Sequence, residues 1–124
     1  MRIVDREAFL QLPAGTLFAK YEPISFGPLL IKGDTSSADF WVQDLLPWPE
    51  GVDDSLQYFD AMEKVAAGGA SGPLDFNCEA RDGLFDHDQL FAVLDRSDVE
   101  ALIERLGQAL YDGYRDPAEA EPIN

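Results

Sequence analysis

The spacing of apolar residues changes along the chain between a period of two and a period of three to four, which predicts both strands and helices. In residues 74–80, Leu74, Phe76, Cys78 and Ala80 alternate with Asp, Asn and Glu, so the pattern predicts a strand with a buried face and an acidic face. Residues 89–94 are almost continuously apolar, which is typical of a strand near the middle of a sheet. Residues 81–88 are then expected to be the loop of a hairpin.

Five earlier segments are also expected to be strands, because they are rich in aromatic or branched residues and are bounded by prolines, glycines or loop-forming residues. They are residues 3–4, 16–22, 24–26, 29–32 and 39–45. Short turns between most of these segments indicate antiparallel pairing.

Three segments have the spacing of amphipathic helices. The first spans residues 6–12 after Asp5 as N-cap, and the second starts at Asp53 or Asp54 and stops at Gly68-Gly69. Ser97 and Glu100 form an S-x-x-E capping box that predicts the start of the third helix. The expected buried stripes are Leu56, Phe59, Met62 and Ala66 in the second helix, and Val99, Leu102, Ile103, Leu106 and Leu110 in the third.

These elements predict an α+β fold, with a mostly antiparallel sheet of about five strands and two or three helices packed on one face. Residues 1–115 are expected to form a single domain, since 124 residues suffice for one core and 46% of them are hydrophobic. Residues 116–124 are expected to be a short polar C-terminal tail.

The charge is the most unusual feature of the composition. The chain has 9 Lys and Arg against 24 Asp and Glu, a net charge of -15, whereas about 2 to 8 charges of either sign are usual for a small domain. Such a chain repels nucleic acid and anionic lipid and attracts basic protein surfaces. Cys78 is the only cysteine, so an internal disulfide is excluded and a reducing cytoplasm is favoured. Neither a targeting segment nor a membrane-spanning run is expected.

Acidic residues are concentrated in runs without basic residues. Eight of them lie between Gly33 and Glu63: Asp34, Asp39, Asp44, Glu50, Asp53, Asp54, Asp60 and Glu63. We expect the start of the second helix and the hairpin to merge into one negative surface that binds a partner, and the alternative is a solvated acidic shell. The candidate partner-binding residues are Asp53, Asp54, Asp75, Glu79, Asp82, Asp86 and Asp88.

Chemistry of other kinds has weaker support in the sequence. Asp82, Asp86, His87 and Asp88 include suitable metal ligands, but their spacing does not match the calcium-loop pattern and one histidine does not make a usual zinc site. Cys78 and His87 would make a nucleophile and base, yet Cys78 shares the inward register of its strand. Hydrolase and nucleotide-binding motifs are missing. We therefore assign no catalytic residue, metal or cofactor, and favour a non-enzymatic role.

Four segments stand out together: Leu12-Pro13-Ala14-Gly15-Thr16, Lys20-Tyr21-Glu22-Pro23, Ile31-Lys32-Gly33-Asp34 and residues 81–93. With them, roughly residues 6–110 resemble small uncharacterised acidic proteins of tailed phages and prophages. The resemblance brings no activity and no site residue with it. It implies a phage-type accessory protein in the cytoplasm of a bacterial host.

The function expected from charge and resemblance is that of an acidic protein-binding module. Its negative surface would dock onto a basic host protein, as a nucleic-acid mimic or anti-CRISPR-like inhibitor, without direct binding of nucleic acid. Two alternatives stay open: a metal-assisted hydrolase that uses the loop from Asp82 to Asp88, and a structural protein that self-associates through aromatic residues. Those aromatic residues are Trp41, Trp48, Tyr58 and Phe59, although burial in the core is the simpler expectation for most of them.

Overall fold

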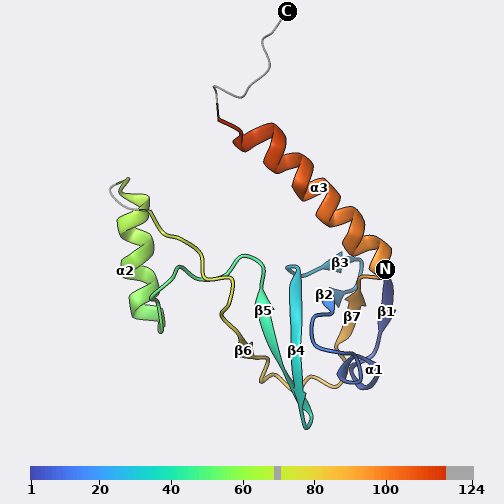
Figure 1. The fold of residues 1–124 in the computed structure, drawn as a ribbon. Helices are drawn as coiled ribbons and strands as arrows, with labels where there is room; N and C mark the ends of the chain where they lie inside the picture. The colour runs from blue at the N-terminus through green and yellow to red at the C-terminus, as the bar shows by residue number, and fades with distance from the viewer. Residues whose placement is uncertain (69–70, 117–124) are drawn as a thin grey trace, which may run out of the picture.

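The fold is an antiparallel sheet with helices attached (Figure 1). A computed structural model of the chain describes residues 1–68 and 71–116. The strands are β1 (Arg2–Val4), β2 (Leu17–Glu22), β3 (Ser25–Phe26), β4 (Leu30–Ser36), β5 (Asp39–Asp44), β6 (Ala80–Arg81) and β7 (Leu90–Val93). They pair in the order β1-β7-β2-β4-β5-β6, with β3 beside β2, and every pairing is antiparallel. The predicted α+β class is confirmed, with seven strands rather than about five.

The helices are α1 (Arg6–Leu10), α2 (Ser55–Ala66) and α3 (Arg96–Tyr114), and α1 alone among them buries side chains. In Figure 1, α3 starts beside β1 and β7 and extends away from the sheet, while α2 lies on the side of β5 and β6. The expectation that two or three helices pack on one face is therefore wrong for α2 and α3. Their apolar spacing shows that they are amphipathic, but it does not show what covers the apolar face.

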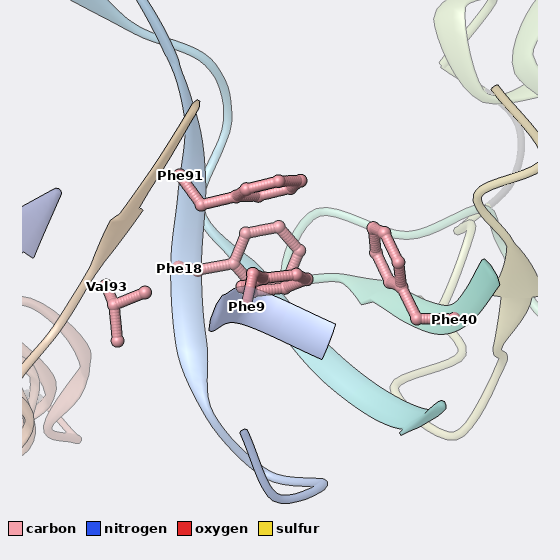
Figure 2. Packing of buried hydrophobic residues seen from close by; sticks show 5 residues of the cluster. All are labelled: Phe9, Phe18, Phe40, Phe91 and Val93. Atoms are coloured by element: carbon pink, nitrogen blue, oxygen red, sulfur yellow. The ribbon is translucent and has the colours of Figure 1, made fainter. Parts of the chain in front are cut away.

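Four phenylalanine rings and a valine form the core (Figure 2). Phe9 of α1 stacks on Phe91 of β7 with ring centroids 4.0 Å apart, and its ring lies 4.6 Å from Phe18 and 4.9 Å from Phe40. Val93 completes the cluster, and all five side chains are at most 1% exposed. Phe9 thus joins α1 to the sheet, because its ring contacts rings from three strands.

The predicted hairpin of residues 74–94 is wrong. Strand β6 pairs with β5 at one edge, whereas β7 lies between β1 and β2, as expected for an interior strand. Because the successive pairings are antiparallel, β6 and β7 run in the same direction, and residues 82–89 cross the sheet between them. In place of a long first strand, the Asp75 carboxylate accepts a hydrogen bond from the Asn77 amide, and Cys78 is exposed instead of inward-facing.

Buried charges anchor the start of this crossing segment. The Asp82 carboxylate, 5% exposed, lies 2.6 Å from Lys20 Nζ and 3.8 Å from the Arg6 guanidinium. The neighbouring Asp39 carboxylate accepts hydrogen bonds from the Gly83 amide at 3.0 Å and from Arg81 Nε at 3.2 Å. The Gly83 amide contributes most to lowering the pKa of Asp39, assisted by the Phe40 amide and Arg81 and opposed by burial.

Helix α3 begins two residues before the predicted capping box. Leu94 still donates its amide to Leu17 of β2, so the chain leaves the sheet at Asp95. Asp95 and Asp98 form the capping box, in place of Ser97 and Glu100.

The helix ends at Tyr114, close to the predicted domain limit at residue 115. Apart from Asp116, the predicted tail lies outside the described residues. No helix in the described part of the chain is long and apolar enough to cross a bilayer.

Candidate functional site

Most of the excess negative charge lies on one side of the molecule. Residues 33–80 contain ten carboxylates and a single basic residue, Lys64. They form the end of β4, all of β5, helix α2 and the connection to β6, which lie together in Figure 1. We call the carboxylates of this segment other than the buried Asp39 the acidic edge. They are Asp34, Asp44, Glu50, Asp53, Asp54, Asp60, Glu63, Asp75 and Glu79.

The acidic edge is largely unpaired. Among the described residues, Asp60 is its one member in a salt bridge, at 3.1 Å from Lys64 Nζ on the exposed surface of α2. An exposed pair of this kind contributes only about 0.3–0.5 kcal/mol and leaves the surrounding potential negative. The side therefore presents an anionic surface to solvent.

A groove of about 500 Å³ lies within this side of the molecule. Its apolar wall comes from β4, β5, the loop that follows β5, and β6. The groove is lined by Leu30, Val42, Asp44, Leu46, Pro47, Trp48, Val52, Asp53, Cys78, Glu79 and Ala80. This volume is within the range of about 300–1,000 Å³ that is usual for ligand sites. Register explains part of the lining, because Leu30 pairs with Asp44 and Val42 pairs with Ala80 across adjacent strands.

The residues that follow β5 form the rim of the groove. Pro47 and Pro49 cannot continue a sheet, and Pro49 forms an isolated bridge with Leu74. The Trp48 indole stacks on Tyr58 of α2 with ring centroids 5.0 Å apart. Asp54 caps α2 by accepting a hydrogen bond from the Gln57 amide at 2.8 Å. These contacts hold the loop between the sheet and α2.

The lining of the groove is complementary to a cation that carries an apolar stem. Three acidic residues, Asp44, Asp53 and Glu79, are among the lining residues together with Trp48, and no basic residue is among them. Lysine and arginine side chains place methylene groups on apolar surface while their charged ends reach polar groups. An indole ring adds attraction for a cation above its face.

The structure divides the seven predicted partner-binding residues into three groups. Asp53 and Glu79 line the groove, and Asp54 and Asp75 belong to the same acidic edge. Asp86 and Asp88 line a separate hollow of about 280 Å³ with Glu22. Asp82 belongs to neither surface, because its carboxylate is buried against Lys20 and Arg6. The expectation that these residues form a single negative surface is therefore wrong. They form two acidic surfaces, and Asp82 belongs to an internal ion pair.

The loop of residues 81–88 does not bring metal ligands together. Asp82 points to Lys20 and Arg6, and the Asp86 carboxylate accepts the Asp88 amide. Within residues 1–68 and 71–116, no three His, Cys, Asp or Glu side chains are placed to share a metal ion.

Nine of the eleven residues that line the groove were not among the predicted partner-binding residues, and Asp44 and Trp48 are two of them. The sequence marks Asp44 only as one of many carboxylates. Trp48 is 42% exposed, which fits the interface alternative given for the four aromatic residues better than burial in the core. Trp41 and Phe59, 38% and 67% exposed, also lie outside the core. The Pro47-Trp48-Pro49 run was the available sequence signal, since an aromatic residue between prolines does not fit the interior of a strand.

The chain was compared with protein-family models, curated proteins and solved structures, and none of them matches it.

Proposed function

We propose that this protein is an acidic protein-binding module that binds a basic surface of a host protein. The observation that carries the proposal is the groove, whose lining combines the acidic residues Asp44, Asp53 and Glu79 with apolar residues and the Trp48 indole. A lysine or arginine side chain of the partner matches this lining in both charge and polarity. Arginine fits best, because its planar guanidinium stacks on aromatic rings and binds carboxylates with two hydrogen bonds.

The acidic edge extends this complementarity beyond one side chain. Nine carboxylates with one basic neighbour attract a positively charged partner before contact and increase the association rate at low salt. Proteins that bind nucleic acid carry positive surfaces, since they neutralise phosphates with lysine and arginine. We therefore propose a nucleic-acid-binding host protein as the partner, and a phage-type inhibitor that mimics nucleic acid as the biological role.

The metal-assisted hydrolase is not proposed. Its expected ligands in residues 82–88 are separated, with Asp82 neutralised by Lys20 and Arg6.

Calorimetric titration with an arginine-rich peptide tests the groove directly. The groove variant carries Asp44→Asn, Asp53→Asn and Glu79→Gln, and the matched control carries Glu22→Gln, Asp86→Asn and Asp88→Asn at the second hollow. Both sets of substitutions change the net charge from -15 to -12. We expect the groove variant to bind at least about tenfold more weakly and the control to lose less than about threefold. Equal losses in both variants would mean that net charge alone attracts the peptide, and would refute the groove as the site.

Capture from bacterial lysate tests the nature of the partner with the same variants. We expect the unsubstituted protein to retain basic nucleic-acid-binding proteins at about 50 mM salt and to release them at about 300 mM, because salt screens attraction between exposed charges. The groove variant should retain less of them than the control. Captured proteins without a basic surface, or retention that does not change with salt, would contradict the proposal.

A further inference from the structure

Helix α3 carries a continuous apolar seam that the rest of the described chain does not use. Val99, Ile103, Leu106 and Leu110 follow at intervals of four, three and four residues, which is the a and d spacing of a coiled coil. We call these four residues the α3 seam. Leu102 and Ala109 border it, and Gly107 leaves space beside it because an added Cβ would meet nothing within 4 Å.

The α3 seam is exposed along most of its length. Ile103, Leu106 and Leu110 are 64%, 60% and 66% exposed, and Val99 alone is half-buried, near the base of the helix. Most of the stability of a helix in a protein comes from packing of its apolar face rather than from helix propensity. Among the described residues of α3 no side chain is fully buried. The helix therefore has the pattern for packing, but among residues 1–68 and 71–116 no element covers its apolar face.

The charge of α3 distinguishes it from the acidic edge. Residues 96–114 contain four acidic and two basic side chains, a net charge of -2, so the remaining residues carry -13. Two copies therefore repel each other less at α3 than at the acidic edge, whose nine carboxylates have a single basic neighbour.

We infer that the α3 seam pairs with the α3 seam of a second copy, in an antiparallel arrangement. This register places Val99 opposite Leu110 and Ile103 opposite Leu106, so that each large side chain of the seam meets an apolar residue. It also brings Arg96 at the start of one helix close to Asp112 near the end of the other. Each of these contacts occurs twice, related by a two-fold axis, which is the geometry of a closed dimer.

Electrostatic repulsion selects the antiparallel orientation over the parallel one. At about 1.5 Å per residue, the 19 residues of α3 span about 28 Å, more than three times the Debye length of about 8 Å at physiological salt. Antiparallel helices hold the two acidic bodies at opposite ends of this span. Parallel helices bring both bodies to the same end.

The area of the seam sets the expected affinity. Three side chains about two-thirds exposed, with the border residues, bury on the order of 500 Å² per copy, or about 1,000 Å² in total, near the lower limit for a specific interface. We therefore expect a monomer–dimer equilibrium with a dissociation constant of about 1–100 μM. Added salt should strengthen the dimer, since it screens repulsion and leaves apolar contacts in place.

Sedimentation velocity across concentrations tests the dimer. The seam variant carries Ile103→Gln and Leu106→Gln, and the matched control carries Leu56→Gln and Phe59→Gln on exposed positions of α2. We expect the unsubstituted protein and the control to shift from monomer to dimer with concentration, and the seam variant to stay monomeric with unchanged circular dichroism. A monomer at all concentrations up to about 500 μM, or a dimer that the seam variant leaves intact, would overturn the inference.

Disulfide formation between copies tests the orientation. In a Cys78→Ser background, Val99→Cys and Leu110→Cys proteins are oxidised separately and as a mixture, and the products are identified by mass. The antiparallel register expects a Val99→Cys to Leu110→Cys disulfide in the mixture and little product in either protein alone. Disulfides that form mainly between identical variants would overturn the antiparallel arrangement.

Discussion

The substitution Phe9→Ala should remove most of the stability of the fold. The Phe9 side chain is fully buried and contacts three other rings, at centroid distances of 4.0 Å to Phe91, 4.6 Å to Phe18 and 4.9 Å to Phe40. Truncating a buried phenylalanine to alanine costs about 3–5 kcal/mol, and the three ring contacts place this position near about 4 kcal/mol. A chain of this length is expected to unfold with a free energy of about 6 kcal/mol or somewhat more.

Urea denaturation followed by far-ultraviolet circular dichroism measures the loss. With a urea dependence of about 1.3 kcal/mol per molar, the midpoint should fall by about 3 M. The control is Phe59→Ala in α2, where the same ring is 67% exposed and the expected cost is below about 0.5 kcal/mol.

The costs of the two substitutions together test the packing of α1 and α2. A cost above about 2 kcal/mol for Phe59→Ala would mean that α2 is packed against apolar surface. A cost below about 1 kcal/mol for Phe9→Ala would mean that α1 does not close the aromatic core.

Four further substitutions test other parts of the fold by the same urea assay. Burial lowers the pKa of Lys32 from its ordinary 10.5, so the unfolded chain binds the lysine proton more strongly than the folded protein does. The free energy of unfolding should therefore rise as the pH rises toward 10.5. Lys32→Met should make this dependence on pH smaller. The Gly83 amide, with Phe40 and Arg81, lowers the pKa of Asp39 from 3.8, so stability should be lost as the pH falls below 3.8. Asp39→Asn should destabilise the protein at pH 7. The difference in unfolding free energy between the unsubstituted protein and Asp39→Asn should become smaller in acid. Gly33→Ala should cost about 1–3 kcal/mol, because its new Cβ would lie 2.8 Å from Trp41 Cβ; Gly107→Ala, in open space on α3, should stabilise by about 0.5–1 kcal/mol. A Gly33→Ala protein as stable as Gly107→Ala, or pH profiles unchanged by either charge substitution, would contradict these contacts.

The sequence predicted the strands that have strong local signals. Residues 16–22 and 39–45 correspond to β2 and β5, and the apolar run at 89–94 contains the interior strand β7. These segments fold as their composition indicates because each is paired on both sides.

The alternating pattern at 74–80 failed for a local reason. A period of two shows which residues would share a face, but a strand also needs a neighbour with free amides and carbonyls. Here β6 pairs with β5 only at Ala80 and Arg81, and the Asp75 carboxylate forms a turn with the Asn77 amide instead.

The packing of the helices and the groove depend on tertiary contacts that the spacing of residues does not contain. The stripes of α2 and α3 were recognised as apolar, but their exposure could not be predicted, because the same spacing fits a helix packed within the chain or against another molecule. The groove is lined by residues of β4, β5, β6 and the 46–53 loop, so Asp44, Asp53 and Glu79 of its lining belong to three separate segments.

The four segments from which the phage resemblance was predicted contact each other in pairs inside the fold. Residues 12–16 contact residues 31–34, and residues 20–23 contact residues 81–93. Gly15 donates its amide to the Lys32 carbonyl at 2.7 Å, and Lys20 Nζ lies 2.6 Å from Asp82. Gly15 also has a φ of +95°, a conformation that favours glycine. These contacts give the segments a structural role, and the resemblance itself stays a prediction.

The central claim is that the groove binds a cationic side chain of a partner, and its most direct test is a nuclear magnetic resonance titration of ¹⁵N-labelled protein with an arginine-rich peptide. We expect the largest shifts at the Trp48 indole and at the Asp53 and Glu79 amides, with small shifts at Asp86 and Asp88. Shifts that are equal at both acidic surfaces, or that leave the Trp48 indole unchanged, would contradict the claim.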